Sequence, residues 1–210
     1  MIGIVIQARM GSSRFPGKVL TSFHGKPMLY FQITRLQGFD LGVPIFIITS
    51  TNPLDDEIVD FCKRHEFSCI RGDEENVISR YQLAARQFNL SHIIRLTGDN
   101  PLPSKVVIER SLHSHLKIQP DLTSTREVFS DHSIRRYVSK GLSVDIINAD
   151  TLLDVDHNSL SPFEQEHVIP VFFKGNYSLN IMNNLPFNDQ LDFSVDTRED
   201  LARVLTYSQF

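Results

Sequence analysis

The 210-residue sequence contains only two cysteines, and it lacks a membrane-length apolar run and an excess of basic residues. Cys62 and Cys69 are not spaced as a Cys-x-x-Cys pair, which argues against a disulfide scaffold or a zinc site. No apolar run approaches ~18 residues and no secretory leader is visible, so we expect a soluble, cytoplasmic protein that does not bind membranes. The net charge of -4 argues against nucleic-acid binding through a general basic surface.

Two common phosphate-binding motifs are also missing. The P-loop pattern GxxxxGK[ST], aligned on Gly17 and Lys18, would require glycine at Ser12 and a hydroxyl residue at Val19. The dinucleotide pattern GxGxxG fails because no glycine follows Gly11 until Gly17. These mismatches exclude both standard loops, although they leave room for a different phosphate site.

A cationic loop does follow the first apolar run, residues 2–6, which we interpret as a buried strand. The loop contains two glycines, two serines and three cations: Arg9, Gly11, Ser12, Ser13, Arg14, Gly17 and Lys18. Flexible backbone, hydroxyl donors and positive charge together favour binding of a polyphosphate. The alternative is a solvated basic turn without a ligand.

Apolar strands and amphipathic helices alternate through the first half of the chain, which predicts a parallel α/β sheet. Expected strands are 2–6, 43–50, 67–70 and 91–97, and expected helices are 27–39, 52–66, 77–88 and 104–116. Ligands of such sheets bind beyond the carboxyl ends of the strands. We therefore expect the loop, Arg71 and Asp99 to converge on one crevice.

The second half is less regular. Residues 121–143 show no clear pattern, and we interpret about 121–175 as a flap or dimerisation segment of a single domain, 1–210. Strands are expected at 144–147, 177–181 and 191–195, and helices at 148–155, at 161–173 with an interruption at Pro170, and from Thr197 onward. His113 and His115 lie two apart on a predicted helix, so we expect both at the surface.

Two aspartates, Asp99 and Asp196, each follow a predicted strand. Mg²⁺ is commonly held by one or two carboxylates together with substrate phosphates. Two such carboxylates near a cationic loop suggest metal-assisted chemistry on a nucleoside triphosphate. For Asp196 the alternative is an interaction with the N-terminus of the following helix.

Five segments resemble the SpsF-type cytidylyltransferases, relatives of the CMP-sialate and CMP-KDO synthetases. They are IVIQARMGSSRFPGKVL (4–20), RGDEENVISRY (71–81), RLTGDNPL (95–102), EHVIP (166–170) and LDFSVDTREDL (191–201), in family order. The resemblance implies a Rossmann-like nucleotidyltransferase fold with a mixed, mostly parallel sheet, a Mg²⁺ requirement and a homodimer. It also implies that CTP and a sugar are the substrates.

The resemblance assigns roles to individual residues. Triphosphate binding falls to Arg9, Gly11, Ser12, Arg14 and Lys18, base or ribose contacts to Ala8, Arg71 and Ser79, Mg²⁺ to Asp99 and Asp196, and sugar or dimer contacts to Glu166 and His167. A sugar carboxylate would need an arginine fork, for which Arg126, Arg135 and Arg136 are candidates by location. Two departures, Gln7 in place of proline and Val19 in place of asparagine, weaken the case for a sialic-type acid.

The expected reaction is in-line attack of a sugar hydroxyl on the α-phosphorus with loss of pyrophosphate. Arg14 and Lys18 would stabilise charge on the leaving phosphates, with Asp99 holding the metal. Transfer from another nucleotide or to a non-sugar alcohol is a second possibility, and a nucleotide-binding scaffold without catalysis is a third.

Overall fold

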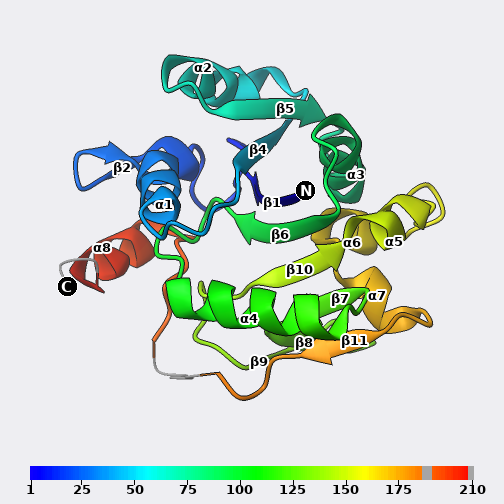
Figure 1. The fold of residues 1–210 in the computed structure, drawn as a ribbon. Helices are drawn as coiled ribbons and strands as arrows, with labels where there is room; N and C mark the ends of the chain where they lie inside the picture. Colours follow the sequence, from blue (N-terminus) through cyan, green and yellow to red (C-terminus); the bar gives the residue numbers. More distant parts are fainter. Residues whose placement is uncertain (186–190, 208–210) are drawn as a thin grey trace.

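A central sheet with helices on both sides forms the framework of the protein (Figure 1). The computed structural model describes residues 1–185 and 191–207. Its main sheet has the strand order β11-β7-β10-β6-β1-β4-β5. These strands are β1 (Ile2–Gln7), β4 (Ile45–Ser50), β5 (Ser68–Gly72), β6 (His92–Thr97), β7 (Leu122–Ser124), β10 (Asp145–Asn148) and β11 (Leu179–Ile181).

Strand direction makes the sheet mixed but mostly parallel. β10 runs antiparallel to both neighbours, β6 and β7, whereas the other adjacent pairs of this sheet are parallel. The interior of β1 is fully buried, as expected where helices cover both faces. The predicted fold class is confirmed.

Helices bury one apolar core on each face of the sheet. One face is covered by α1 (Met28–Gln37), α2 (Asp56–Arg64) and α4 (Lys105–Ile118), and the other by α3 (Val77–Gln87), α5 (Ala149–Asp154), α6 (Pro162–His167) and α7 (Pro170–Lys174). The last described helix, α8 (Arg198–Tyr207), packs through Val204 against Phe15 and Phe23. It therefore lies against the segment that follows β1.

Several helix starts follow local capping chemistry. Asn76 and Ser104 accept backbone N–H groups at the starts of α3 and α4, and Ser161 forms a capping box with Glu164 at α6. Asn52 caps a short 3-10 turn (Pro53–Asp55) that leads into α2. These caps explain why the predicted helices begin close to where the structure places them.

The predicted strand at 191–195 is wrong. Instead of a strand, the segment has one isolated bridge, between Asp192 and Lys140. Its backbone donors are used elsewhere, since Phe193 N–H bonds the Lys140 carbonyl, Val195 N–H bonds the Asp99 carbonyl and Ser194 N–H bonds the Asp192 carboxylate. Asp196 consequently follows a loop and not a strand.

Residues 121–143 are more ordered than their sequence indicates. They contain β7 of the main sheet and a hairpin of β8 (Arg126–Val128) with β9 (Ile134–Arg136). A second small hairpin pairs β2 (Ser22–Phe23) with β3 (Lys26–Pro27), just after a 3-10 turn at Lys18–Leu20. Three-residue strands are too short for an alternating apolar pattern to reveal them.

Two further expectations also need correction. Strand β5 extends past the predicted end at residue 70 and includes Arg71 and Gly72. His115 is fully buried, where it contacts Thr123 Oγ1 through Nδ1 at 2.9 Å and His92 Nδ1 through Nε2 at 3.1 Å. Burial, with a smaller effect of His92, lowers the pKa of His115 to about 4. The surface prediction failed because packing against β6 and β7 is not visible in helical spacing.

Candidate active site

A cavity of about 450 Å³ opens at the carboxyl ends of β1 and β6. Among the described residues that line it are eight arginines and lysines, one histidine and only three carboxylates. Such an excess of positive charge favours an anionic ligand. This is where ligands of α/β sheets are expected to bind.

The loop after β1 is folded back on itself by its own backbone. Ser12 and Gly17 both donate their N–H groups to the Met10 carbonyl, and Met10 N–H donates to Asp55 Oδ1 at 2.7 Å. Gly17 has φ +71°, a left-handed conformation that favours glycine. The turn places Lys18 at the start of a 3-10 helix with its side chain in the cavity.

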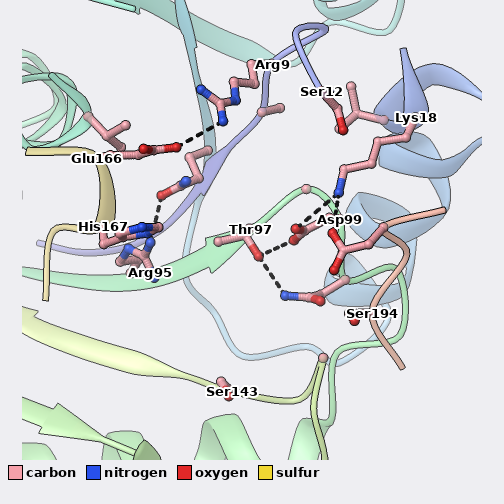
Figure 2. Close-up of a pocket in the computed structure, with 18 of the residues that line it drawn as sticks. Arg9, Ser12, Lys18, Arg95, Thr97, Asp99, Ser143, Glu166, His167 and Ser194 are labelled. Carbon is pink, nitrogen blue, oxygen red and sulfur yellow. Dashed lines mark hydrogen bonds and ion pairs between the residues drawn. The ribbon is translucent and has the colours of Figure 1, made fainter. Parts of the chain in front are cut away.

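Lys18 lies between the two predicted metal ligands (Figure 2 shows its contact with Asp99). Its Nζ is 2.9 Å from Asp196 Oδ1 and 3.4 Å from Asp99 Oδ2, and it also donates to the Val195 carbonyl at 2.8 Å. Thr97 Oγ1 donates to the other oxygen of Asp99 and fixes that carboxylate. Two carboxylates that are remote in sequence thus converge on one cationic atom.

Asp196 is held in its charged form by its neighbours. Burial alone would raise its pKa, but the hydrogen bond and charge of Lys18, together with Arg14 and Lys140, hold the pKa below its ordinary value. Arg14 Nη2 lies 3.1 Å and Lys140 Nζ 3.6 Å from this carboxylate. The side chain therefore faces the cavity's cations, which does not support the alternative of an interaction with the N-terminus of α8.

The donor set fits Mg²⁺. In residues 1–185 and 191–207 no group of three or more metal-ligating side chains occurs. Asp99 and Asp196 nevertheless each place a carboxylate oxygen within 3.4 Å of Lys18 Nζ. Mg²⁺ in nucleotide sites typically takes one or two carboxylates and completes its shell with phosphates and water. A bound ion would then depend on the nucleotide as well as on the protein.

The other half of the cavity rests on a buried ion network. Asp145, 1% exposed, accepts Arg95 Nη1 at 3.0 Å and Arg126 Nη2 at 2.6 Å on the same oxygen. Arg95 Nη2 also donates to Gln7 Oε1 at 2.9 Å. Burial would raise the pKa of Asp145, but Arg126 and Arg95 hold it below its ordinary value. Two guanidiniums share one carboxylate, so one positive charge remains uncompensated within this network.

Glu166 and His167 lie near this network (Figure 2). Glu166 Oε1 is 3.0 Å from Arg9 Nη2. Burial lowers the pKa of His167. The negative charge of Glu166 raises this pKa, but the positive charges of Arg95, Arg126 and Arg9 lower it further. His167 is therefore favoured in its neutral form, able to accept or donate one hydrogen bond.

Most of the predicted site residues line the cavity together: Ala8, Arg9, Ser12, Arg14, Lys18, Asp99, Arg126, Glu166, His167 and Asp196. Gly11, Arg71 and Ser79 are not among the described residues that line it. Arg71 is instead bound to the Ser50 and Asn52 carbonyls and to Asp56. Ser79 Oγ donates to the Asn76 carbonyl within the first turn of α3.

The sequence interpretation missed several cationic lining residues. Arg95 lies inside the apolar strand HIIRLT, and a charge at such a position is a signal that could have been used. Arg80 lies on the buried face of α3, three residues after Val77. Lys140 carries no comparable local signal, because its position depends on the contact with Asp192.

The mixed α/β sheet, the cationic loop and the paired aspartates define a nucleotidyltransferase. The chain belongs to the cytidylyltransferase family, whose profile matches residues 3–201. It is therefore an enzyme of that type, and the resemblance stated from the sequence is confirmed.

Individual relatives agree with this assignment. The chain is 28% identical to the spore coat polysaccharide biosynthesis protein SpsF of Bacillus subtilis, over 95% of this chain and 83% of that protein. It is 29% identical to a 3-deoxy-manno-octulosonate cytidylyltransferase of Chlamydia trachomatis, over 62% of this chain and 55% of that enzyme. A solved cytidylyltransferase from Leptospira borgpetersenii superposes with TM-score 0.88 at 27% identity, covering 100% of this chain and 87% of that one.

Proposed function

We propose that the enzyme transfers CMP from CTP to an acidic sugar, with Mg²⁺ and with release of pyrophosphate, for surface polysaccharide or glycan synthesis. The observation that carries the acidic acceptor is the Arg95–Asp145–Arg126 network. Both arginines line the cavity and share one oxygen of Asp145, so the network keeps one positive charge without a matching anion. A carboxylate on the acceptor would balance that charge.

The relatives support the same class of acceptor. The Chlamydia enzyme is named for 3-deoxy-manno-octulosonate, a sugar acid, and the Bacillus protein is named for spore coat polysaccharide. No helix among the described residues could cross a bilayer. These names guide the choice of acceptors for the assay below.

In this mechanism the cavity binds and aligns its two substrates. Lys18 and Arg14 would bind the β and γ phosphates and stabilise the charge that builds on departing pyrophosphate. Asp99 and Asp196 would hold Mg²⁺, which supplies charge neutralisation at the phosphates. Arg126 and Arg95 would fix the acceptor carboxylate so that a hydroxyl faces the α-phosphorus. The acceptor hydroxyl oxygen would form the new bond to the α-phosphorus as the bond to pyrophosphate breaks and the hydroxyl proton passes to solvent, so no covalent intermediate with the protein is needed.

The direct test is pyrophosphate release from each of four nucleoside triphosphates, with acidic sugars and their uncharged alcohol analogues as acceptors. We expect turnover with CTP and an acid, and little with the matched alcohol. Turnover with another nucleotide, or equal use of acid and alcohol, would contradict the proposal. Binding of nucleotide without any turnover would favour a scaffold.

A matched pair of variants tests the acceptor site. Arg126→Met should raise the KM for the acid at least tenfold while leaving the KM for CTP within about twofold. Arg135→Met is the control, because Arg135 lies on the same hairpin but its side chain is 64% exposed. Equal effects of the two substitutions would mean that the hairpin's general charge, and not Arg126, binds the acid.

We also propose that the enzyme is a homodimer joined through the β8–β9 hairpin. This hairpin exposes Phe129 and Ile134, with relative exposures of 41% and 39%. Exposed apolar side chains on this hairpin favour burial against a second copy. Sedimentation of the wild type should show a dimer, and Phe129→Ser should shift it toward the monomer. A wild-type monomer at micromolar concentration would contradict the proposal.

A further inference from the structure

Asp55 is a buried carboxylate that the proposed mechanism does not use. The residue is 2% exposed and ends the short 3-10 turn that follows β4. No lysine, arginine or histidine of the described residues lies within ion-pair distance of it, and its hydrogen-bond partners are neutral donors. A buried charge without a counter-ion is costly unless such donors are aimed at it. Each of these donors is therefore important for Asp55.

Three donors stabilise this carboxylate, and one of them comes from a distant part of the chain. Ser50, at the end of β4, donates to Oδ2 through its N–H at 3.0 Å and through its hydroxyl at 2.5 Å. Met10 N–H, in the cationic loop after β1, donates to Oδ1 at 2.7 Å. Strands β1 and β4 are parallel neighbours, so the segments that follow them lie side by side. Asp55 joins these two segments through Met10.

Met10 is the residue around which the cationic loop closes. Its carbonyl accepts the N–H groups of Ser12 and Gly17. Its side chain packs against the core that α1 and α2 cover, and a Cβ at Gly17 would lie 3.3 Å from Met10 Cε. Lys18 follows Gly17 directly. A shift of the Met10 backbone would therefore move both the Ser12 hydroxyl and the Lys18 ammonium.

We propose that Asp55 is a positioning residue for triphosphate binding, because it fixes the Met10 backbone and so holds the cationic loop in its binding conformation before the ligand arrives. Arg9, Arg14 and Lys18 repel one another, so an unanchored loop would spread. An ordered loop loses less conformational entropy on binding, which raises the affinity for the ligand. Asp55 is not among the described residues that line the cavity, so it acts through Met10. This inference rests on the proposed binding of a nucleoside triphosphate.

Equilibrium binding of inorganic tripolyphosphate and of CTP, each with Mg²⁺, tests the proposal. In Asp55→Asn only one of the two terminal atoms can accept a hydrogen bond, so amide N–H groups would face either Met10 N–H or the Ser50 donors. We expect the Kd for both probes to rise about tenfold or more, because the loop loses a charged anchor. An unchanged Kd in the folded variant would overturn the proposal.

Ser50→Ala is the matched control, because it weakens the same buried site but leaves the bond from Met10 N–H in place. The Ser50 hydroxyl donates to Asp55 and accepts Asn52 N–H at 3.1 Å, so its removal should lower Tm. The Kd for tripolyphosphate should nevertheless stay within about twofold of the wild-type value. If Asp55 had only a structural role, both variants would weaken binding in proportion to their loss of Tm. That result would also refute the proposal.

Hydrogen exchange on the wild type covers the case in which Asp55→Asn does not fold. The Met10 and Gly17 amides should exchange slowly in the ligand-free protein, because both are hydrogen-bonded in the preformed loop. Rapid exchange of both amides that slows only when tripolyphosphate is added would mean that the ligand, and not Asp55, orders the loop. The proposal would then be wrong.

Turnover assays separate this inference from the proposed function. Asp55→Asn should raise the KM for CTP but leave the KM for the acid within about twofold, because the Arg95–Asp145–Arg126 network has no hydrogen bond to Asp55. If the wild type turns over CTP and Asp55→Asn binds tripolyphosphate normally, the proposed function stands and only the role of Asp55 fails. Asp55-dependent binding of tripolyphosphate without turnover of any nucleotide would support the role of Asp55 and contradict the proposed function.

Discussion

Replacement of Asp145 by asparagine should destabilise the whole domain, because the buried ion network depends on this one carboxylate. Asp145 is 1% exposed and pairs with Arg95 and Arg126, while its second oxygen accepts Ser124 Oγ at 2.8 Å. Asp145→Asn keeps the shape and the bond from Ser124 but removes the charge. Two guanidiniums would then remain close together with no anion among these partners.

The size of the effect follows from the cost of leaving a buried charge unpaired. Removal of one partner from a buried pair typically costs about 3–5 kcal/mol. Asparagine retains an acceptor oxygen, so we expect the lower end, about 3 kcal/mol. For a chain of this length that corresponds to a fall in Tm of roughly 6–12 °C. Calorimetric unfolding of the wild type and of Asp145→Asn at neutral pH measures this fall in Tm directly.

The matched control is Asp154→Asn, because Asp154 is exposed at the end of α5 and should change Tm by less than about 2 °C. The pH dependence supplies a second check. The folded pKa of Asp145 is depressed, so its contribution is complete above the unfolded value of about 4 and is lost as the pH falls through the folded value. The difference in Tm between the wild type and Asp145→Asn should therefore become smaller at acidic pH. A constant gap, or a Tm change as small as the control's, would refute the reasoning.

Further predictions concern the metal site, a helix cap and a buried histidine. Lys18→Met should slow pyrophosphate release at least ~100-fold. Titration calorimetry should nevertheless show that the nucleotide-free variant binds Mg²⁺ more tightly, because Lys18 no longer competes for Asp99 and Asp196. Weaker Mg²⁺ binding would contradict this prediction. Removal of divalent ions by EDTA should abolish turnover, and added Mg²⁺ should restore it. Glu164→Gln should cost about 1 kcal/mol in urea unfolding, because glutamine can still complete the capping box but loses the ion pair with Lys174, whose Nζ lies 2.7 Å from Glu164 Oε1. Burial opposes ionisation of Glu164, but Lys174 and Ser161 lower its pKa to about 2, so the difference should shrink as the pH falls from the unfolded value of about 4 toward 2. The imidazole of His115, with its pKa lowered to about 4, should stay neutral in NMR titrations down to that pH, and stability should rise with pH between about 4 and 6.5.

Local sequence signals predicted the framework because the framework is locally determined. The apolar run of β1 and the caps at Asn76 and Ser104 each act within a few residues. The failed expectations share a different cause. His115 is buried by His92 and Thr123 from other elements, so no window along one helix contains the relevant information.

The candidate site shows the same division. Lys18 could be proposed from its own loop, because glycines, serines and cations gather there in sequence. Arg80 and Arg95 could not be assigned in that way, since burial of a charge depends on which strands and helices pack around it. For Arg95 the partner is Asp145, on a strand that pairs with β6 only in the folded sheet. A charge within an apolar strand is thus a clue to a partner but does not identify it.

The pairing of Asp99 with Asp196 is a tertiary result that neither local sequence contains. Val195 N–H donates to the Asp99 carbonyl at 2.9 Å, which ties the C-terminal segment to the turn after β6. The Arg198 guanidinium lies 5.1 Å from the ring centre of Phe15, so the start of α8 also contacts the loop that follows β1. The loop after β1, the turn after β6 and helix α8 therefore hold one another in place. These contacts bring the carboxylates of Asp99 and Asp196 together at Lys18. Asp196 lies beside Asp99 at Lys18 although the strand predicted before it is absent, because these long-range contacts fix its position.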